Sequence, residues 1–366
     1  MQKLTLEEIT IIIPTYKRSK FLFKNLKFWE SFNTNIIVLD GSHVSIKKKK
    51  FDLFKNNIKY FFKKNSNFEE RLYLASLSIK TPYCVILGDD EIHSPWALNK
   101  SINFLKKNRD YGCCIGRCVG FKAVGKYLNL WPEKTIQSKH FVNQKNSLVR
   151  LNYHIKNYTP STLYAVHKLK SFKFSTKLFK NFKFDSPYIQ ETVFELLSAA
   201  YSKCKVLSYL SWFRNFENNP VIDKNSKRLY FLSDWFNNKK NLKVIKELKK
   251  SIVDSILKLN ENDKKTIRNN IDYILNYRVL SDKKNLKEAK LRYKFKDNNF
   301  VEKTFNRVKI FFKFILIKKN IGEFCFFIDK KKYNYYLLHN AKIKFITKEL
   351  NFINSFLLGK NDIKNR

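Results

Sequence analysis

The chain has 366 residues, of which 44% are hydrophobic and 16% aromatic, enough for a folded core, which excludes an intrinsically disordered polymer. Its formal net charge of +42 is typical of proteins that bind nucleic acid or anionic membranes. The basic residues are spread along the chain, and Lys, Asn, Ile, Phe and Tyr, which are abundant together, share A/T-rich codons. We therefore discount the charge as evidence for nucleic acid, although not for an anionic surface.

The six cysteines and the hydropathy pattern bear on the location of the protein. No cysteine forms a C-x-x-C pair or has a histidine at zinc-ligand spacing, which argues against a zinc site and favours small core residues. The N-terminus lacks a basic region followed by a long apolar stretch, and no uncharged apolar run of about 18 residues occurs. We expect a cytoplasmic protein with reduced thiols, no signal peptide and no transmembrane helix.

The N-terminal third alternates strand-like and helix-like stretches. Helical spacing occurs at 21–32 and 68–79. Short apolar runs typical of buried strands occur at 9–13, 36–39, 58–62 and 85–87. Strands separated by helices of this length require right-handed crossovers, which produce a mainly parallel sheet. The sequence therefore predicts the α/β fold class, with a Rossmann-like central sheet flanked by helices.

The alternation continues, less regularly, after residue 90. We expect a helix from Ser94 to 107, a strand over 111–124, loops over 126–150, an apolar run at 163–166, a helix over 188–202 and a strand over 206–213. These elements complete a predicted α/β domain of residues 1–222.

From about residue 225, Lys- and Asn-rich helical patterns take over, and we predict an appended α-helical region over 223–366. Three patterns are present, at 242–259, 264–280 and 301–319. The last keeps Val301 and Phe305 on one apolar face with lysines between, as in a basic helix that lies on an anionic membrane. Core packing surrounded by solvated lysines explains the same pattern. Peripheral contact with the inner face of a membrane is therefore one of two open interpretations.

Polar residues follow three of the predicted strands at their carboxyl ends. They are the turn at 14–18, the Asp40-Gly41-Ser42 turn and the acidic triplet at 89–91. In a parallel sheet these ends lie at one edge, so the three turns should converge on one crevice. Adjacent carboxylates supply the hard oxygen ligands that Mg²⁺ or Mn²⁺ prefers. Alternatively, the triplet faces the N-terminus of the next helix, where negative charge is favoured.

Four segments carry a family resemblance. They are ITIIIPTYKR at 9–18, IIVLDGS at 36–42, VILGDDE at 85–91 and, more loosely, YIQETVFELL at 188–197. Together they cover roughly residues 8–215. This part of the chain resembles the nucleotide-sugar-dependent glycosyltransferases of family 2, which have the GT-A fold. The predicted C-terminal helical region lies outside the resemblance.

The resemblance implies a nucleotide-sugar site on the first two turns. Pro14, Thr15 and Tyr16 would form the floor and wall of the nucleotide pocket. Arg18 would lie near the phosphates, and Asp40 would accept hydrogen bonds from the base or the ribose.

The acidic triplet would correspond to the DxD-type motif of the family. Asp89 and Asp90 would bind the donor, and Asp90 with Glu91 would hold Mg²⁺ or Mn²⁺ on its diphosphate. Gly88 stands where an aspartate is common, and Glu91 replaces a third aspartate. Which carboxylate contacts the metal therefore stays open.

Family 2 enzymes usually invert the anomeric centre with one general base, placed in an acidic pair that opens a helix after the acceptor-binding strand. Glu191 occupies that place, with Asp185 and Glu195 as alternatives. Glu191 would otherwise stabilise the first turn of its own helix.

Two arginines and the histidines complete the candidate residues. Arg214, at the end of the next strand, would contact the diphosphate or lie at the surface. Arg71 would face the nucleotide or form a surface ion pair with Glu69 or Glu70. No histidine has partner spacing that suggests zinc, so none is assigned a role.

The resemblance thus implies an inverting glycosyltransferase that moves a sugar from a nucleotide-diphosphate sugar to a hydroxyl of a glycan or lipid-linked acceptor. The setting would be surface polysaccharide or glycoconjugate synthesis, with no nucleic-acid partner. One alternative is a basic protein that binds nucleic acid or anionic membrane on an inactive α/β scaffold. Another is a nucleotidyltransferase, although residues 14–20 lack the glycines of a phosphate-binding loop.

Overall fold

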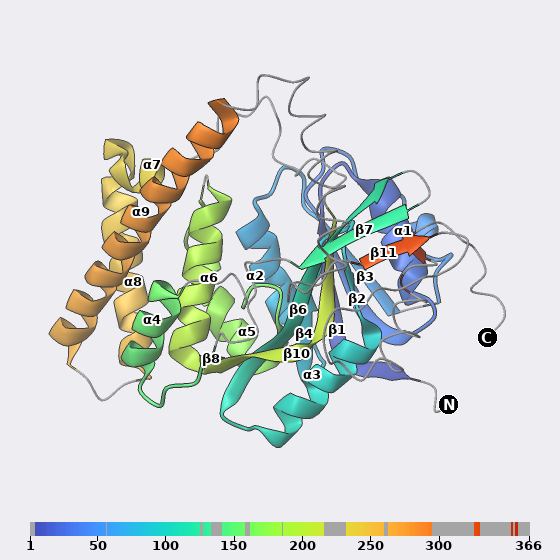
Figure 1. Ribbon diagram of the computed structural model, residues 1–366, viewed down its shortest axis with the longest axis horizontal. Coiled ribbons are helices and arrows are strands. Elements are labelled where there is room, and N and C mark those ends of the chain that lie inside the picture. Colours follow the sequence, from blue (N-terminus) through green and yellow to red (C-terminus); the bar gives the residue numbers. More distant parts are fainter. Residues whose placement is uncertain are drawn as a thin grey trace, which may run out of the picture.

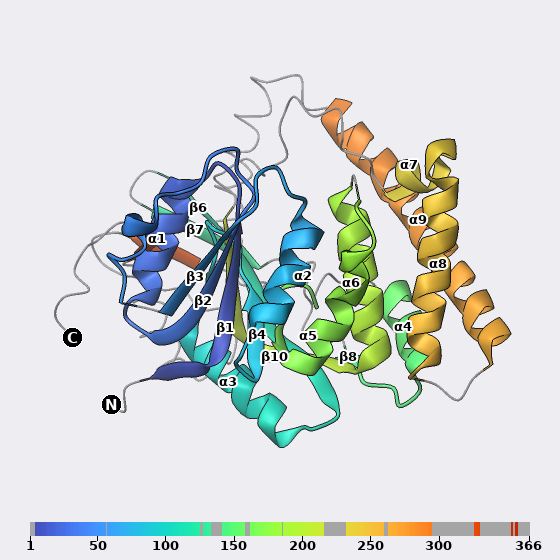
Figure 2. The ribbon, with the colours of Figure 1, turned by 180° about the vertical axis from the view of Figure 1, so that it is seen from behind.

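The computed structural model describes residues 4–55, 57–124, 127–132, 141–157, 162–184, 186–215, 232–259, 263–294 and 326–329, together with 353, 356 and 357. A mixed β-sheet carries helices on both faces, and a further group of helices lies beyond one of these layers (Figure 1). Figure 2 shows the same layers from behind. The expected α/β fold class is confirmed.

The first four strands form the parallel core of the sheet. They are β1 (Thr5–Thr15), β2 (Asn33–Asp40), β3 (Asn57–Phe62) and β4 (Tyr83–Ile86). β1 pairs in parallel with β2 and β4, and β2 pairs in parallel with β3. Ile11, Ile12 and Ile13 are fully buried, as an apolar run between two helical layers requires. The four predicted strands are confirmed, and their carboxyl ends share one edge.

The rest of the sheet adds antiparallel pairs that the sequence pattern does not predict. The strands involved are β5 (Ile92–His93), β6 (Tyr111–Val124), β7 (Tyr127–Pro132), β8 (Phe141–Val142), β9 (Val166–Lys168), β10 (Lys203–Asn215) and β11 (Phe326–Asp329). β9 runs antiparallel between β4 and β6, and β7 and β11 follow β6. β10 pairs in parallel with β6 and antiparallel with β5 and β8.

The prediction of loops over 126–150 is wrong. β7, β8 and the start of helix α4 (Ser147–Lys156) lie in this segment. β8 has only two residues, so it shows no period. The start of α4 has a local signal, because the Asn146 side chain accepts hydrogen bonds from the backbone N–H groups of Leu148 (2.8 Å) and Val149 (3.2 Å).

Helices cover both faces of the sheet. α1 (Ser19–Trp29) and α3 (Pro95–Lys107) lie on one side, where the rings of Phe32 and Trp96 meet edge to face. α2 (Phe68–Ser78), α5 (Leu169–Thr176) and α6 (Pro187–Tyr201) cover the other (Figures 1 and 2). Short 3-10 helices occupy Lys48–Lys50, Lys177–Lys180 and Lys239–Asn241.

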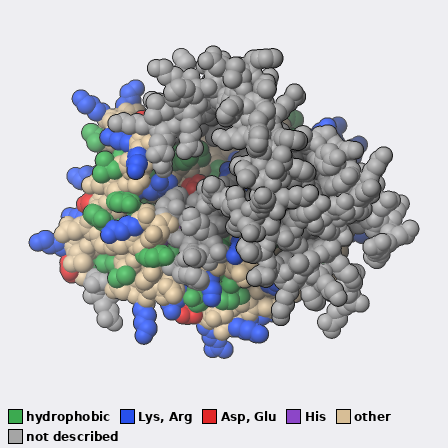
Figure 3. All heavy atoms as spheres, in the orientation of Figure 1, with side chains coloured by type: hydrophobic (Ala, Val, Ile, Leu, Met, Phe, Trp, Pro, Cys, Tyr) green, Lys and Arg blue, Asp and Glu red, His purple; other side chains and the backbone are tan. Residues whose placement is uncertain are grey.

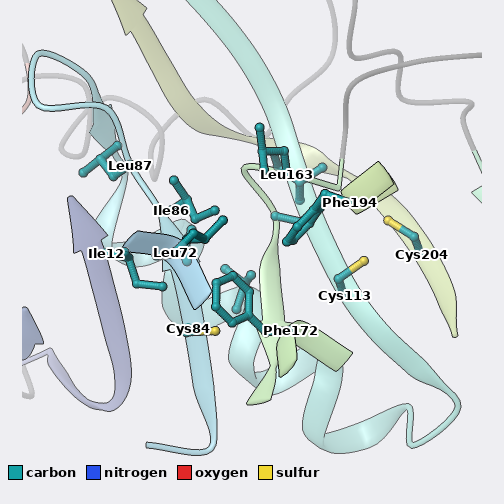
Figure 4. Close-up of a cluster of buried hydrophobic side chains, with 14 of the residues drawn as sticks. Ile12, Leu72, Cys84, Ile86, Leu87, Cys113, Leu163, Phe172, Phe194 and Cys204 are labelled. Atoms are coloured by element: carbon teal, nitrogen blue, oxygen red, sulfur yellow. The ribbon is translucent and has the colours of Figure 1, made fainter. Parts of the chain in front are cut away.

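The hydrophobic core fills both faces of the sheet, beneath α1 and α3 on one side and beneath the α2–α5–α6 layer on the other. Figure 4 shows Ile12 of β1 and Leu72 of α2 beside Phe172 and Phe194 from α5 and α6. Five cysteines in the described part of the chain are free and buried, at 84, 113, 114, 118 and 204. The prediction that they are core residues is confirmed for these five.

Three helices lie outside this layer, at the left of Figure 1. They are α7 (Leu232–Asn237), α8 (Leu242–Leu257) and α9 (Lys264–Lys294). α9 packs on α4 and α8 packs on α6, and their buried Ile252 and Ile271 join the core of the α/β part. The second predicted helix therefore runs longer than expected, whereas the third, at 301–319, lies outside the described residues.

Lys and Arg side chains are scattered over the described part of the face in Figure 3, in line with their even spread along the sequence. None of the helices within the described ranges is both long and apolar enough to cross a membrane.

Candidate functional site

The three predicted turns meet at the carboxyl edge of the parallel strands, and Thr15 touches both of the others. Thr15 is the register partner of Asp40, and its carbonyl accepts a hydrogen bond from Gly41 N (3.2 Å). Its hydroxyl donates to Asp89 Oδ2 (2.7 Å). The expected convergence follows from the sheet order, because β1 lies between β2 and β4.

Arg18 separates the first two acids of the triplet. Its guanidinium contacts Asp89 Oδ1 at 3.2 Å and forms a second, shorter ion pair with Asp90. Lys17 adopts a left-handed conformation (φ 55°), which turns the chain after β1. Arg18 follows this turn and directly precedes α1. The Ser42 hydroxyl accepts the Lys17 N–H at 2.8 Å and holds this turn against the second one.

Glu91, the third acid, points to another part of the sheet. The indole N–H of Trp212 on β10 donates to Glu91 Oε2 (2.8 Å), and Arg214 Nε lies 3.9 Å from Oε1. The triplet thus divides into an Arg18-bound pair and a third carboxyl beside β10. The Arg214 side chain is 42% exposed and lies beside Glu91, so neither of its two alternatives is excluded.

Burial gives Asp89 and Glu91 unusual acid–base properties. Burial raises the pKa of Asp89 to about 7, against the lowering effects of Arg18 and the Thr15 hydrogen bond. Burial likewise raises the pKa of Glu91 to about 7, although Arg214 and Trp212 lower it. Both carboxyls therefore exchange protons near neutral pH.

Asn25, which the sequence analysis did not select, holds the acidic turn in shape. Its buried side-chain amide donates to the carbonyls of Gly88 (3.2 Å), Asp89 (3.3 Å) and Glu91 (2.7 Å). The Trp29 indole donates to Asn25 Oδ1 (2.8 Å). The sequence could have indicated this role, because an asparagine on the apolar face of a helix is expected to be buried and a buried amide requires hydrogen-bond partners.

Asp40 lies at the base of a cavity of about 700 Å³. Its fully buried carboxylate accepts hydrogen bonds from Ser42 N (2.8 Å) and the Tyr60 hydroxyl (2.7 Å). Thr15, Arg18 and Asp40 line this cavity together with cationic side chains, namely those of Lys17, Lys47, Lys49 and Lys50. Among the residues that the structure describes, no ion pair neutralises these four lysines, so the cavity suits an anionic ligand.

Arg71 supports the cavity from below, and the prediction of a surface ion pair is wrong. The side chain is only 7% exposed, and its guanidinium donates to the carbonyls of Thr15 (3.1 Å) and Leu39 (2.6 Å). Glu69 is also buried and accepts hydrogen bonds from Phe184 N and the Gln190 amide, both at 2.6 Å. The charges are internal because α2 packs directly beneath the turns.

The charges of Glu191 and of the acidic turn act on the same phenol, that of Tyr164. Burial raises the pKa of Tyr164 well above its usual value, and the charges of Glu91, Glu191 and Asp90 add to the effect while Arg214 opposes it. The first turn of α6 contains no acidic residue, so the helix-stabilising interpretation of Glu191 does not hold.

The two alternative bases differ in what the structure shows of them. Glu195 is fully buried, with its oxygens bonded to His154 Nε2 (2.8 Å) and to the N–H groups of Thr162 (2.9 Å) and Leu163 (3.0 Å). These contacts favour a structural role for Glu195. Asp185 lies outside the described residues.

A cation at the acids of 89–91 would need ligands from a bound diphosphate. Among the described residues no group of three or more His, Cys, Asp or Glu side chains is arranged to hold a metal ion. Mg²⁺ is commonly held by one or two carboxylates plus substrate phosphates. Asp90, which pairs with Arg18, and Glu91, which is bonded to Trp212, would each offer one carboxylate to such a cation.

The comparisons with known proteins extend this picture at the level of fold. The chain matches the crystal structure of S. aureus TarS 1-349 in complex with UDP-GlcNAc with a TM-score of 0.50 and 15% identity, over 74% of this chain and 72% of that one. It matches S. aureus TarS with a TM-score of 0.47 and 12% identity, over 43% of that chain. No protein-family profile matches the sequence, and no curated protein matches it significantly. The expected GT-A type of fold, a glycosyltransferase-like α/β fold, is thereby confirmed.

Proposed function

We propose that the chain is an inverting glycosyltransferase of family 2 type that takes its sugar from a nucleoside diphosphate, with UDP-GlcNAc as the first donor to test. The observation that carries the proposal is the cationic cavity above Asp40, which adjoins the Arg18–Asp89–Asp90 cluster in a glycosyltransferase-like fold. The TarS 1-349 complex with UDP-GlcNAc supports the choice of donor.

In this proposal the donor lies across the first two turns. Asp40 accepts hydrogen bonds from the base or the ribose, and Pro14, Thr15 and Tyr16 form the pocket wall. Arg18 exchanges its ion pairs with Asp89 and Asp90 for contacts to the diphosphate, which a planar guanidinium binds well. Arg214 approaches the diphosphate from the other side.

Glu191 is the proposed general base. It accepts the proton of the acceptor hydroxyl while the hydroxyl oxygen bonds to the anomeric carbon from the face opposite the leaving group. The bond from that carbon to the diphosphate breaks at the same time, so nucleoside diphosphate departs and the configuration inverts. A divalent cation on Asp90 and Glu91, when bound, would neutralise charge on this leaving group.

The test is donor binding and turnover in the full chain and in Asp90→Ala. UDP-GlcNAc with Mn²⁺, at about 100 times its dissociation constant, should stabilise the wild-type fold by about 2.7 kcal/mol. Asp90→Ala should keep its fold and lose at least about 100-fold in the rate of UDP release. Asp254→Ala, an exposed acid on α8, is the control and should match the wild type.

Two results would contradict the proposal. One is full activity in Asp90→Ala. The other is salt-sensitive binding of oligonucleotides by a protein that does not bind any nucleotide sugar, which would favour the basic binding protein. An EDTA arm of the same assay tests the cation, whose removal should lower UDP release.

A further inference from the structure

A column of stacked rings adjoins the acidic turn, and none of its rings lines the cavity proposed for the nucleotide. The rings of Tyr164 and Trp212 stack with their centroids 4.2 Å apart and their planes at 23°. The ring of His93 also stacks on Trp212, at 6.4 Å and 21°. His93 and Trp212 are buried, whereas Tyr164 is half-buried, so the column ends at a partly exposed aromatic ring.

This column is fixed to the candidate site at its middle. The indole N–H of Trp212 donates to Glu91, so the ring cannot turn without losing a partly buried hydrogen bond. The outer ring, Tyr164, interacts electrostatically with Asp90, Glu91 and Glu191. The half-buried Tyr164 ring thus stacks on the indole that is bonded to Glu91, and the charge of Glu191 also acts on its phenol.

The backbone that carries Tyr164 is also fixed. Glu195 accepts hydrogen bonds from the N–H groups of Thr162 and Leu163, the two residues before Tyr164. His167 Nε2 lies 2.5 Å from the Thr162 carbonyl oxygen. Glu195 and His167 are fully buried. The ring is therefore presented on a rigid support, as a recognition surface requires.

We propose that the Tyr164 ring is the platform for a pyranose ring of the acceptor. A sugar ring has an apolar C–H face and a rim of hydroxyls, and an aromatic ring next to a carboxylate complements both features. Tyr164 does not line the cavity proposed for the nucleotide, so its ring is left for the acceptor. This inference rests on the proposed function, because an acceptor hydroxyl must lie beside Glu191.

The test uses saturation-transfer NMR on the full chain with UDP. The probes are the methyl β-glycosides of glucose, galactose, mannose and N-acetylglucosamine. At least one should receive saturation at the C–H groups of one ring face. Tyr164→Phe, which keeps the aromatic face, should retain the signal, and Tyr164→Ala should reduce it at least fivefold. Tyr201→Ala is the matched control, because Tyr201 is also half-buried and ring-paired, with Phe174 at 4.8 Å.

Three results would overturn the inference. The first is that the wild type saturates none of the four glycosides, and the second is that Tyr164→Ala saturates them as strongly as the wild type does. The third is that Tyr164→Ala loses only the signals from the sugar of UDP-GlcNAc, which would place Tyr164 against the donor. A measurement of UDP-GlcNAc binding distinguishes a failure of the platform inference from a failure of the proposed function. If the wild type binds UDP-GlcNAc and Tyr164→Ala binds it within twofold, a missing glycoside effect counts against the platform alone.

Discussion

Arg18 contacts both Asp89 and Asp90, so the charge that holds these two acids together comes from within the chain. Three adjacent carboxylates repel one another unless a cation lies between them. Arg18 also lines the cavity above Asp40. We therefore expect Arg18 to change partners when a diphosphate binds, leaving Asp90 nearest to an incoming cation.

Glu191→Gln tests the proposed base at the residue scale. The amide keeps the size of the side chain and cannot accept the acceptor proton, so turnover should fall by about 10² to 10⁴. UDP-GlcNAc affinity, measured by calorimetry, should stay within twofold. Loss of donor binding in this variant would instead place Glu191 in the donor pocket and point to a different base.

Asn25→Leu tests the support of the acidic turn. The substitution leaves the Trp29 indole N–H and the carbonyls of Gly88, Asp89 and Glu91 without this partner. Urea unfolding should show a loss of about 3 kcal/mol, since each buried group without a partner costs about 1–3 kcal/mol. Asn152→Leu, which removes a single hydrogen bond to Leu148 O on α4, should cost less than about 1 kcal/mol. Equal losses would show that Asn25 has no special role.

At the scale of elements, the first two turns depend on α2. Arg71 reaches up from this helix to one carbonyl at the end of β1 and another at the end of β2. It passes directly beneath Gly41, where an added Cβ would lie 2.7 Å from the guanidinium carbon. The glycine is required for space at this point, because the guanidinium is held by three carbonyl partners, those of Thr15, Leu39 and Asn67.

Gly41→Ala should therefore displace Arg71 and lower the free energy of unfolding by about 2 kcal/mol, through loss of its buried hydrogen bonds. In an Arg71→Ala background the same substitution should cost less than about 0.5 kcal/mol, because the clash is gone. Urea unfolding of the two single variants and the double variant measures this coupling. Additive losses would contradict a direct clash between the two residues.

At the scale of the whole molecule, four buried groups have opposing effects on stability. Burial lowers the pKa of His93 to about 3 and that of His167 to about 4. The unfolded chain therefore binds these protons first, and stability falls as pH decreases from 6.5. Asp89 and Glu91 have pKa values raised to about 7, so the folded chain binds their protons first, and stability rises as pH decreases from 7 to about 4.5.

These four effects should nearly cancel between pH 4.5 and 6.5, because each changes stability by up to about 1.4 kcal/mol per pH unit. Glu91→Gln removes one stabilising contribution. Relative to the wild type, the free energy of unfolding of this variant should fall by up to about 1.4 kcal/mol per pH unit as pH falls through this range. Urea unfolding at pH 4.5, 5.5 and 6.5 with EDTA measures the difference, and parallel profiles for the two proteins would refute the prediction.

The parallel core was accessible from the sequence because buried strands and amphipathic helices leave periodic patterns, as at 9–13 and 68–79. The convergence of Thr15, Asp40 and Asp89 followed from strand ends alone, since parallel strands bring their carboxyl ends to one edge. The antiparallel half was not accessible in the same way. A two-residue strand such as β8 has no period, and strand pairing depends on distant partners.

The α/β class, the polar turns and their order along one sheet edge were predictable from the sequence. The contacts between groups were not. The folded chain places Arg71 under the turns rather than at the surface, bonds Asn25 to the carbonyls of the acidic turn, and stacks Tyr164 on the indole that is bonded to Glu91. The difference is one of range. Periodicity reports local burial, whereas hydrogen bonds and charge pairs join residues that are far apart in the chain and leave no local pattern.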